Sequence, residues 1–129
     1  MIERRVVSSG GPWEARVGYS RAVRAGRHVW VAGSTAMTPA GLIGAGDAYL
    51  QTRQALQTVE RALVEVGASL ADVVRTRIYL IDIDHWPEVA RAHAETFATV
   101  RPAATMVEVR RLIDPEMLVE IEADAFVTR

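Results

Sequence analysis

The sequence predicts an α+β fold, in which two helices cover one face of a β-sheet as a two-layer sandwich. Apolar residues repeat at helical spacing in two segments and alternate at strand spacing in others, and the helical segments fall between the strand segments. The chain has 129 residues, which is enough to build a core without metals or disulfides. We therefore expect a single domain over residues 1–129.

Three strands are expected in the first third of the chain. Residues 2–8 are rich in β-branched side chains and run into a turn-prone segment with two glycines and a proline, which predicts a strand followed by a loop. Residues 19–25 and 28–32 flank a glycine and predict a hairpin. Residues 37–46 contain one proline and three glycines, which predicts irregular chain with at most a short hairpin arm.

Two helices are expected further along. In the first, Asp47 is the expected N-cap and Gly67 is placed to end the helix in a left-handed conformation. Its apolar face comprises Leu56, Val59, Leu63 and Val66. In the second, Asp84 is the expected cap and Pro87 lies in the first turn, where its missing N–H costs nothing. This helix should end near Val100, because the proline at position 102 prevents its continuation.

Strands are expected at residues 73–81, 103–112 and 117–128. In the first of these, the residues expected to face the helices are Val74, Thr76, Ile78 and Leu80. In the last strand the apolar face comprises Val119, Ile121, Ala123, Ala125 and Val127, and the opposite face comprises Leu118, Glu120, Glu122, Asp124 and Phe126.

The sheet face away from the helices is expected to mix charges with apolar groups. Its other expected members are Arg75, Arg77 and Tyr79 from one strand and Met106, Glu108 and Arg110 from another. A face with both paired ions and apolar anchors suits a subunit interface. The alternative is an antiparallel sheet with one solvated face.

Composition excludes several classes of protein. The chain has no cysteine, which excludes disulfide scaffolds, zinc–cysteine sites and thiol catalysis. A formal net charge of −1 argues against a dedicated nucleic-acid binder, and no apolar run is long enough to span a membrane. We expect a cytoplasmic protein without metal or cofactor.

Glu120 is the main candidate for chemistry. It lies in mid-strand between two apolar residues, where desolvation would raise its pKa and allow proton exchange near neutrality. The alternative is that Glu120 pairs with an arginine on a neighbouring strand. His85 and the acidic residues near it are a possible metal site. Acidic residues are also common at helix N-termini because they interact favourably with the helix dipole, so we do not expect a metal there.

Six segments occur in an order that resembles one family. They are GYSRAV (18–23), VAG (31–33), QTRQAL (51–56), GASLADVV (67–74), RPAATMVEV (101–109) and VEIEA (119–123). Together they are similar to the RidA/YjgF family of enamine and imine deaminases, also called L-PSP endoribonucleases. The resemblance runs essentially from end to end. It implies a chorismate-mutase-like fold with a mixed sheet, assembled as a homotrimer with three clefts between subunits.

The resemblance also implies site residues. In active deaminases of the family, an arginine holds the substrate carboxylate, while a glutamate and backbone groups position the water that attacks the imine carbon. Carried over to this chain, the glutamate is Glu120, the cleft tyrosine is Tyr19 and the backbone position is Met106. The position of the arginine is occupied by Ala104, which cannot bind a carboxylate.

Two neighbours of Ala104 are candidate replacements for the arginine. Arg101 lies three residues earlier in the chain, and Thr105 is adjacent. Alternation along the strand groups Ala104 with Met106 and points Thr105 to the other face, so Thr105 is the weaker candidate.

Three functions follow from these residues. The first is a deaminase or hydrolase of a small imine, enamine or related carbonyl metabolite, although the alanine at the arginine's position argues against 2-aminoacrylate deamination. The second is a trimer that binds a small metabolite without turning it over. A ribonuclease activity is suggested by the older family name alone, and neither the net charge nor the distribution of basic residues favours it.

Overall fold

A computed structural model describes residues 3–129 and confirms the α+β class. A six-stranded sheet has the order β1-β2-β3-β8-β6-β7. The strands are β1 (Arg4–Val7), β2 (Ala22–Ala25), β3 (His28–Ser34), β6 (Val73–Leu80), β7 (Ala103–Glu108) and β8 (Val119–Phe126). The β6–β7 pair is parallel and the other pairs are antiparallel, so the sheet is mixed.

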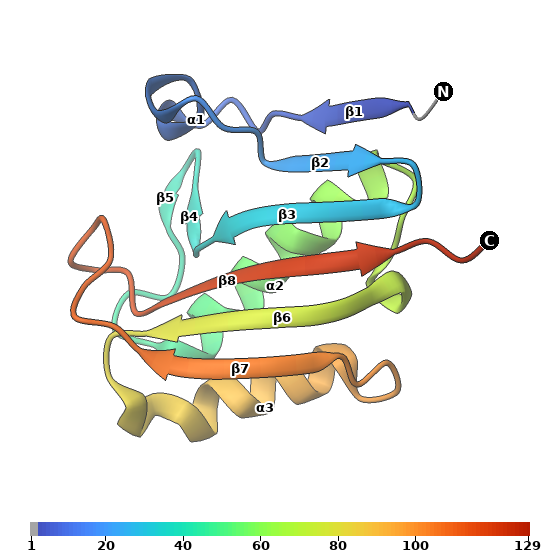
Figure 1. Cartoon of the computed structure of the whole chain (residues 1–129). Coiled ribbons are helices and arrows are strands. Elements are labelled where there is room, and N and C mark those ends of the chain that lie inside the picture. The colour runs from blue at the N-terminus through green and yellow to red at the C-terminus, as the bar shows by residue number, and fades with distance from the viewer. Residues whose placement is uncertain (1–2) are drawn as a thin grey trace.

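Two long helices, α2 (Ala48–Glu65) and α3 (Trp86–Phe97), lie on one face of the sheet (Figure 1). The opposite face carries no helix and is called the open face below. A short hairpin of β4 (Met37–Thr38) and β5 (Gly41–Leu42) confirms the predicted hairpin arm. Two 3₁₀ turns, η1 (Leu70–Asp72) and η2 (Ile83–His85), precede β6 and α3. No helix in the described part of the chain is long and apolar enough to cross a membrane.

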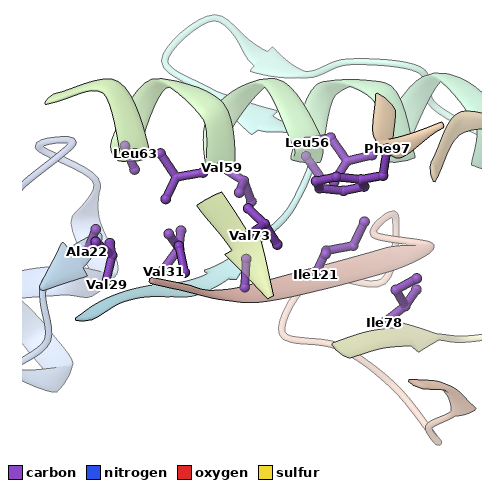
Figure 2. Packing of buried hydrophobic residues seen from close by; sticks show 14 of the residues in the cluster. Ala22, Val29, Val31, Leu56, Val59, Leu63, Val73, Ile78, Phe97 and Ile121 are labelled. Atoms are coloured by element: carbon purple, nitrogen blue, oxygen red, sulfur yellow. The ribbon is translucent and has the colours of Figure 1, made fainter. Parts of the chain in front are cut away.

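The core lies between α2, α3 and the covered sheet face. Leu56, Val59 and Leu63 project from α2 toward β3 and β8, as Figure 2 shows. The predicted apolar face of β8 is confirmed, since Val119, Ile121 and Ala123 are completely buried. The predicted N-cap of α2 is also confirmed, because Asp47 accepts a hydrogen bond from the Leu50 amide at 2.9 Å.

Residues 8–11 form the predicted loop, but an unpredicted helix, α1 (Pro12–Val17), follows it, with a proline in its first turn and Gly18 left-handed at its end. Asp84 does not cap α3. The Asp82 carboxylate instead accepts from the Asp84 amide and begins the preceding 3₁₀ turn.

Helix α3 also ends earlier than predicted, at Phe97 rather than near Val100. Pro102 disfavours helical geometry in the residue before it. Arg101 leaves the helical region with a left-handed φ of 52° and donates its backbone N–H to the Phe97 carbonyl at 2.9 Å.

A β-bulge reverses the predicted side of Val74. Between Val73 and Arg75 the register of β6 against β8 shifts by one residue. Val73 therefore faces the core, whereas Val74 is 52% exposed. Thr76, Ile78 and Leu80 face the helices as predicted.

The expected facing of β7 was also wrong. In the observed register Met106 stands beside Ile78 and Glu108 beside Leu80, which places both on the covered side of the sheet. The open face of β7 instead carries Ala103, Thr105 and Val107, which stand beside Arg75, Arg77 and Tyr79. Alternation alone does not say which side of a partly polar edge strand is covered, because that depends on its pairing with β6.

Candidate functional site

The Glu120 side chain lies on the open face, directly over the backbone of Gly33. A β-carbon built on Gly33 would overlap Glu120 Oε2 and would lie 2.9 Å from Glu120 Cδ. Gly33 belongs to a bulge of β3, where two residues stand opposite one residue of β8 between the Val31 and Ser34 pairs. The missing side chain at Gly33 therefore makes the space that the carboxylate occupies.

The environment of Glu120 favours its protonated form. The side chain is half-buried, and this burial raises the pKa of the Glu120 carboxyl above its ordinary value. The positive charge of Arg21 lowers that pKa and the negative charge of Glu122 raises it, and the net shift is upward. A glutamate held in this way can give and take a proton closer to neutral pH than an exposed one.

Pairing of Glu120 with an arginine, the alternative raised by the sequence, is absent among the described residues. Arg77 is engaged further along β8, at 3.2 Å from Asp124 Oδ2 and 3.7 Å from Glu122 Oε1. The Tyr79 hydroxyl donates to Glu122 Oε1 at 2.7 Å, which raises the pKa of Tyr79. The other two carboxylates of this row thus have cationic or hydroxyl partners, and Glu120 has neither.

A cleft of about 530 Å³ lies on the same face, next to the end of α1. Its lining includes Arg4, Tyr19, Trp30, Arg77, Glu122 and Asp124. Glu120 does not line this cleft. It lies on the same face of β8, two residues before Glu122. Tyr19 connects the two places, because it lines the cleft and its ring centre is 5.6 Å from Cζ of Arg21, whose charge acts on Glu120.

A buried ionic group surrounds the start of β2. Arg21 is 8% exposed, and its Nη1 donates to Ser34 Oγ at 3.2 Å. Glu14 of α1 is also buried, and its carboxylate accepts from the backbone amide and the hydroxyl of Ser9. Burial alone would raise the pKa of Glu14, but the hydrogen bonds from Ser9 and Ser8 and the positive charge of Arg21 outweigh it and hold the pKa below its usual value.

The remaining predicted site residues lie at the far edge of the sheet. Ala104 and Met106 are on β7, separated from β3 by β6 and β8, and Arg101 precedes that strand. Strands are spaced about 4.8 Å apart, so Ala104 lies on the order of 15 Å from β3. Within one chain, the structure places Glu120 where the charge of Arg21 acts on it, and the Tyr19 ring lies over Arg21. Arg101, Ala104 and Met106 lie far from these residues in the same chain.

The outer edge of strand β7 exposes backbone groups that no strand of residues 3–129 pairs with. The Val109 amide donates to the Leu80 carbonyl at 2.7 Å, so odd-numbered amides of this strand point toward β6. Amides alternate in direction along a strand, and those of Ala104 and Met106 consequently point away from the sheet. The Thr105 side chain lies on the open face beside Arg77. The prediction that Thr105 points away from the site, and is therefore the weaker replacement for the arginine, assumed the opposite facing of β7.

Metal ligation has no support in the described residues, where no group of three or more His, Asp or Glu side chains could hold an ion. Sequence reasoning missed two residues of the site. Arg21 lies two residues after Tyr19 in the chain, but no periodic pattern in the sequence predicts its burial, and Gly33 acquires its role from the bulge of β3.

Comparison with known proteins places this chain and its fold in one family. A family model described as endoribonuclease L-PSP matches residues 12–127. The crystal structure of Rv2704 from Mycobacterium tuberculosis, described as a member of the YjgF/YER057c/UK114 family, superposes with a TM-score of 0.89 and 54% sequence identity. That match covers 97% of this chain and all of the other.

Two relatives show how varied the family is. An uncharacterized protein of Streptomyces coelicolor, SCO2049, is 43% identical over 95% of this chain and 91% of its own length. The 3-aminoacrylate deaminase RutC of Acinetobacter baylyi is 36% identical over 84% of this chain and 86% of its own. The chain belongs to the RidA/YjgF/L-PSP family.

Proposed function

We propose that this protein hydrolyses a small imine, enamine or related carbonyl metabolite at clefts between the subunits of a homotrimer. The observation that carries the proposal is Glu120, a half-buried carboxylate with a raised pKa that lies over Gly33 and lacks an ionic partner among residues 3–129. Such a group can move protons in the hydrolysis of a C=N bond. The deaminase activity named for the relative RutC supports this reaction class.

In the proposed reaction, Glu120 takes a proton from water as the oxygen attacks the imine carbon. Glu120 passes this proton to the nitrogen, which gives a carbinolamine. It then carries the proton of the new hydroxyl to the nitrogen as the C–N bond breaks and the C=O bond forms, and the products are a carbonyl compound and ammonia. For an enamine, protonated Glu120 first delivers a proton to the β-carbon, which gives the imine. The raised pKa suits both steps, because it brings the two protonation states closer in free energy at neutral pH than they are in an exposed glutamate.

The placement of the site residues supports a site shared between subunits. Tyr19 and Glu120 lie on the β3 side of the sheet, whereas Met106 lies on the free edge strand and directs its amide outward. A second copy whose edge strand approached Glu120 would add backbone donors to the site. Such donors, aimed at the attacking water or the developing charge, stabilise a hydrolytic transition state.

The test is the rate of imine loss and ammonia release above the spontaneous rate. Substrates are generated in place by an amino-acid oxidase, which yields imines with a carboxylate, or by an amine oxidase, which yields uncharged imines. We expect Glu120→Gln to lower the rate by about 10²- to 10⁴-fold, the usual contribution of a positioned acid–base group. An unchanged rate in this variant contradicts the proposed role of Glu120.

Ala104→Arg tests the role of the alanine at the arginine's position. Ala104 is exposed, so an arginine can be accommodated, and it would add a charged fork for a carboxylate. We expect at least a tenfold gain on carboxylate-bearing imines and no gain on uncharged ones. If the native chain and this variant are both inert on all imines, the second function, a trimer that binds a metabolite without turnover, replaces the enzyme.

A further inference from the structure

The short helix α1 is attached to the rest of the molecule by a charged side chain. A helix of six residues is too short to be stable on its own in water, so its position depends on contacts with other segments. Within residues 12–17 only Glu14 is buried, whereas the large apolar residues Trp13 and Val17 are 37% and 68% exposed. Burial of apolar side chains therefore contributes little to the position of α1.

The Glu14 carboxylate binds the segment that precedes the helix. Both of its oxygens accept from the Ser9 amide at 3.2 Å, and Oε2 also accepts from the Ser9 hydroxyl. The positive charge of Arg21 further stabilises the ionised carboxylate. A buried carboxylate is costly unless donors and a counter-charge surround it, and Glu14 has both. The attachment of α1 thus depends on the charge of Glu14.

The backbone of the same residue positions Tyr19. The Glu14 carbonyl accepts from the amides of Gly18 at 2.8 Å and of Tyr19 at 3.0 Å, where the left-handed Gly18 ends the helix. Directly after this turn, the Tyr19 ring lines the cleft and lies over the guanidinium of Arg21. A movement of α1 would therefore move one wall of the cleft.

We propose that Glu14 is a positioning residue, which fixes Tyr19 at the cleft by holding α1 to Ser9 and beside Arg21. This inference rests on the proposed function, to which it adds a residue that does not itself line the cleft. Glutamine at position 14 would keep the shape of the side chain. It would lack the charge that compensates Arg21, and its NH₂ group would be a further donor beside those of Ser9.

The test is amide hydrogen exchange of the full chain, followed by NMR. In Glu14→Gln we expect the amides of Gly18 and Tyr19 to exchange at least tenfold faster than in the native protein, while the amides of β8 keep their rates, because only α1 is released. Glu88→Gln is the matched control, since it makes the same chemical change at an exposed glutamate in the first turn of α3. It should leave all of these rates unchanged.

Unchanged exchange at Gly18 and Tyr19 in Glu14→Gln overturns the inference. An increase that is equally large in β8 also overturns it, because the whole fold would then be destabilised. If Glu14→Gln does not fold, Ser9→Ala takes its place, since it removes the hydroxyl donor and leaves the carboxylate intact. At least threefold faster exchange is expected there at the same two amides, and native rates would contradict the proposal.

Kinetics of imine hydrolysis separate positioning from a general structural role. We expect Glu14→Gln to raise KM at least fivefold with a smaller change in kcat, because the wall of the cleft moves while Glu120 is retained. A lower kcat at an unchanged KM would indicate a loss of folded protein and would contradict the proposed role. Ser9→Thr, which keeps the hydroxyl donor, should have the native KM.

The exchange measurement needs no substrate, so the two proposals can fail independently. Faster exchange confined to Gly18 and Tyr19, in a protein that hydrolyses no imine, keeps the role of Glu14 in placing Tyr19 and removes the hydrolase. Hydrolysis with the same KM and native exchange in Glu14→Gln keeps the hydrolase and removes the role of Glu14.

Discussion

At the scale of single residues, Glu120 and Gly33 form a matched pair. The carboxylate occupies the volume that any other side chain at position 33 would take. The backbone of Gly33 does not have the positive φ that requires glycine. The glycine is therefore explained by the close approach of Glu120 and not by strain.

Gly33→Ala is expected to lower turnover by about 10²-fold with little loss of stability. The added carbon would displace the Glu120 carboxylate, and small misplacements of a reacting group have costs of this order. The carboxylate is the end of a flexible side chain, so the fold can yield without losing core contacts. Steady-state rates and thermal unfolding measure the two effects.

Gly11→Ala is the control for this change, because a β-carbon there meets its nearest atom at 3.4 Å, an ordinary contact distance. It should leave the rate unchanged. Equal rates for Gly33→Ala and the native protein would show that the position of Glu120 is unimportant.

Glu120 also gives stability a defined pH dependence. Because its pKa is raised in the fold, the folded chain binds more protons than the unfolded chain between the ordinary glutamate pKa of 4.5 and the pKa of Glu120 in the folded chain. Its contribution is complete below 4.5 and is lost as the pH rises through the folded pKa. We expect Glu120→Gln to gain stability relative to the native protein as the pH rises from 4 to 8, measured by denaturant unfolding.

Glu65→Gln, a change at an exposed glutamate, should show a much flatter difference over the same range. If Glu120→Gln and Glu65→Gln follow the same curve, Glu120 is not desolvated. We therefore expect Glu120→Gln to be more stable and less active than the native protein at neutral pH. The negative charge of Glu120 destabilises the folded state, and the same charge takes part in the proposed reaction.

At the scale of elements, a buried glutamine of α2 holds the segment that leads into β8. Gln51 is fully buried, and its amide donates to the carbonyls of Gly44 and Glu116 at 3.2 and 3.0 Å. Its carbonyl oxygen accepts from the Leu118 amide at 2.9 Å. This residue thus fixes the start of the strand that carries Glu120.

Gln51→Leu is expected to cost about 3 kcal/mol, because it leaves the Glu116 carbonyl and the Leu118 amide without partners and each buried unsatisfied group costs about 1–3 kcal/mol. Gln57→Leu makes the same chemical change at an exposed position of α2 and should cost less than about 0.5 kcal/mol. Urea unfolding of both variants compares them directly. Equal costs would mean that the Gln51 bonds contribute nothing to stability.

At the scale of the whole molecule, the open face exposes apolar side chains that a solvated sheet would not need. Val6, Trp30 and Val107 are between 41% and 54% exposed. Trp30 stacks on His28 with ring centres 5.5 Å apart. Together with the ion pairs of Arg77, they form a mixed surface of the kind found at subunit interfaces.

Trp30→Asp is expected to break up the proposed trimer. It removes an aromatic anchor and places a charge beside Asp124, its cross-strand neighbour. Light scattering should report three times the chain mass of 14.2 kDa for the native protein and a lower mass for the variant. Val64→Asp, on an exposed position of α2, is the control and should remain trimeric. A monomeric native protein would contradict the proposed assembly.

The sequence by itself determined the class of fold, both long helices, the covered face of β8 and the family. These follow from periodicity and motif order, which are local properties of the chain. It also indicated Glu120, because a carboxylate between apolar neighbours in mid-strand predicts desolvation whatever the strand pairs with.

The tertiary structure alone decided how residues from different strands meet. Bulges in β3 and β6 created the space over Gly33 and exposed Val74, and the pairing of β6 with β7 set which side of Met106 faces outward. The surroundings of Arg21 likewise come from the tertiary structure, which brings Ser34 of β3 and the ring of Tyr19 to its guanidinium. Register and packing are properties of pairs of segments, and a one-residue shift reverses every side chain of a strand, so they cannot be derived from one segment alone.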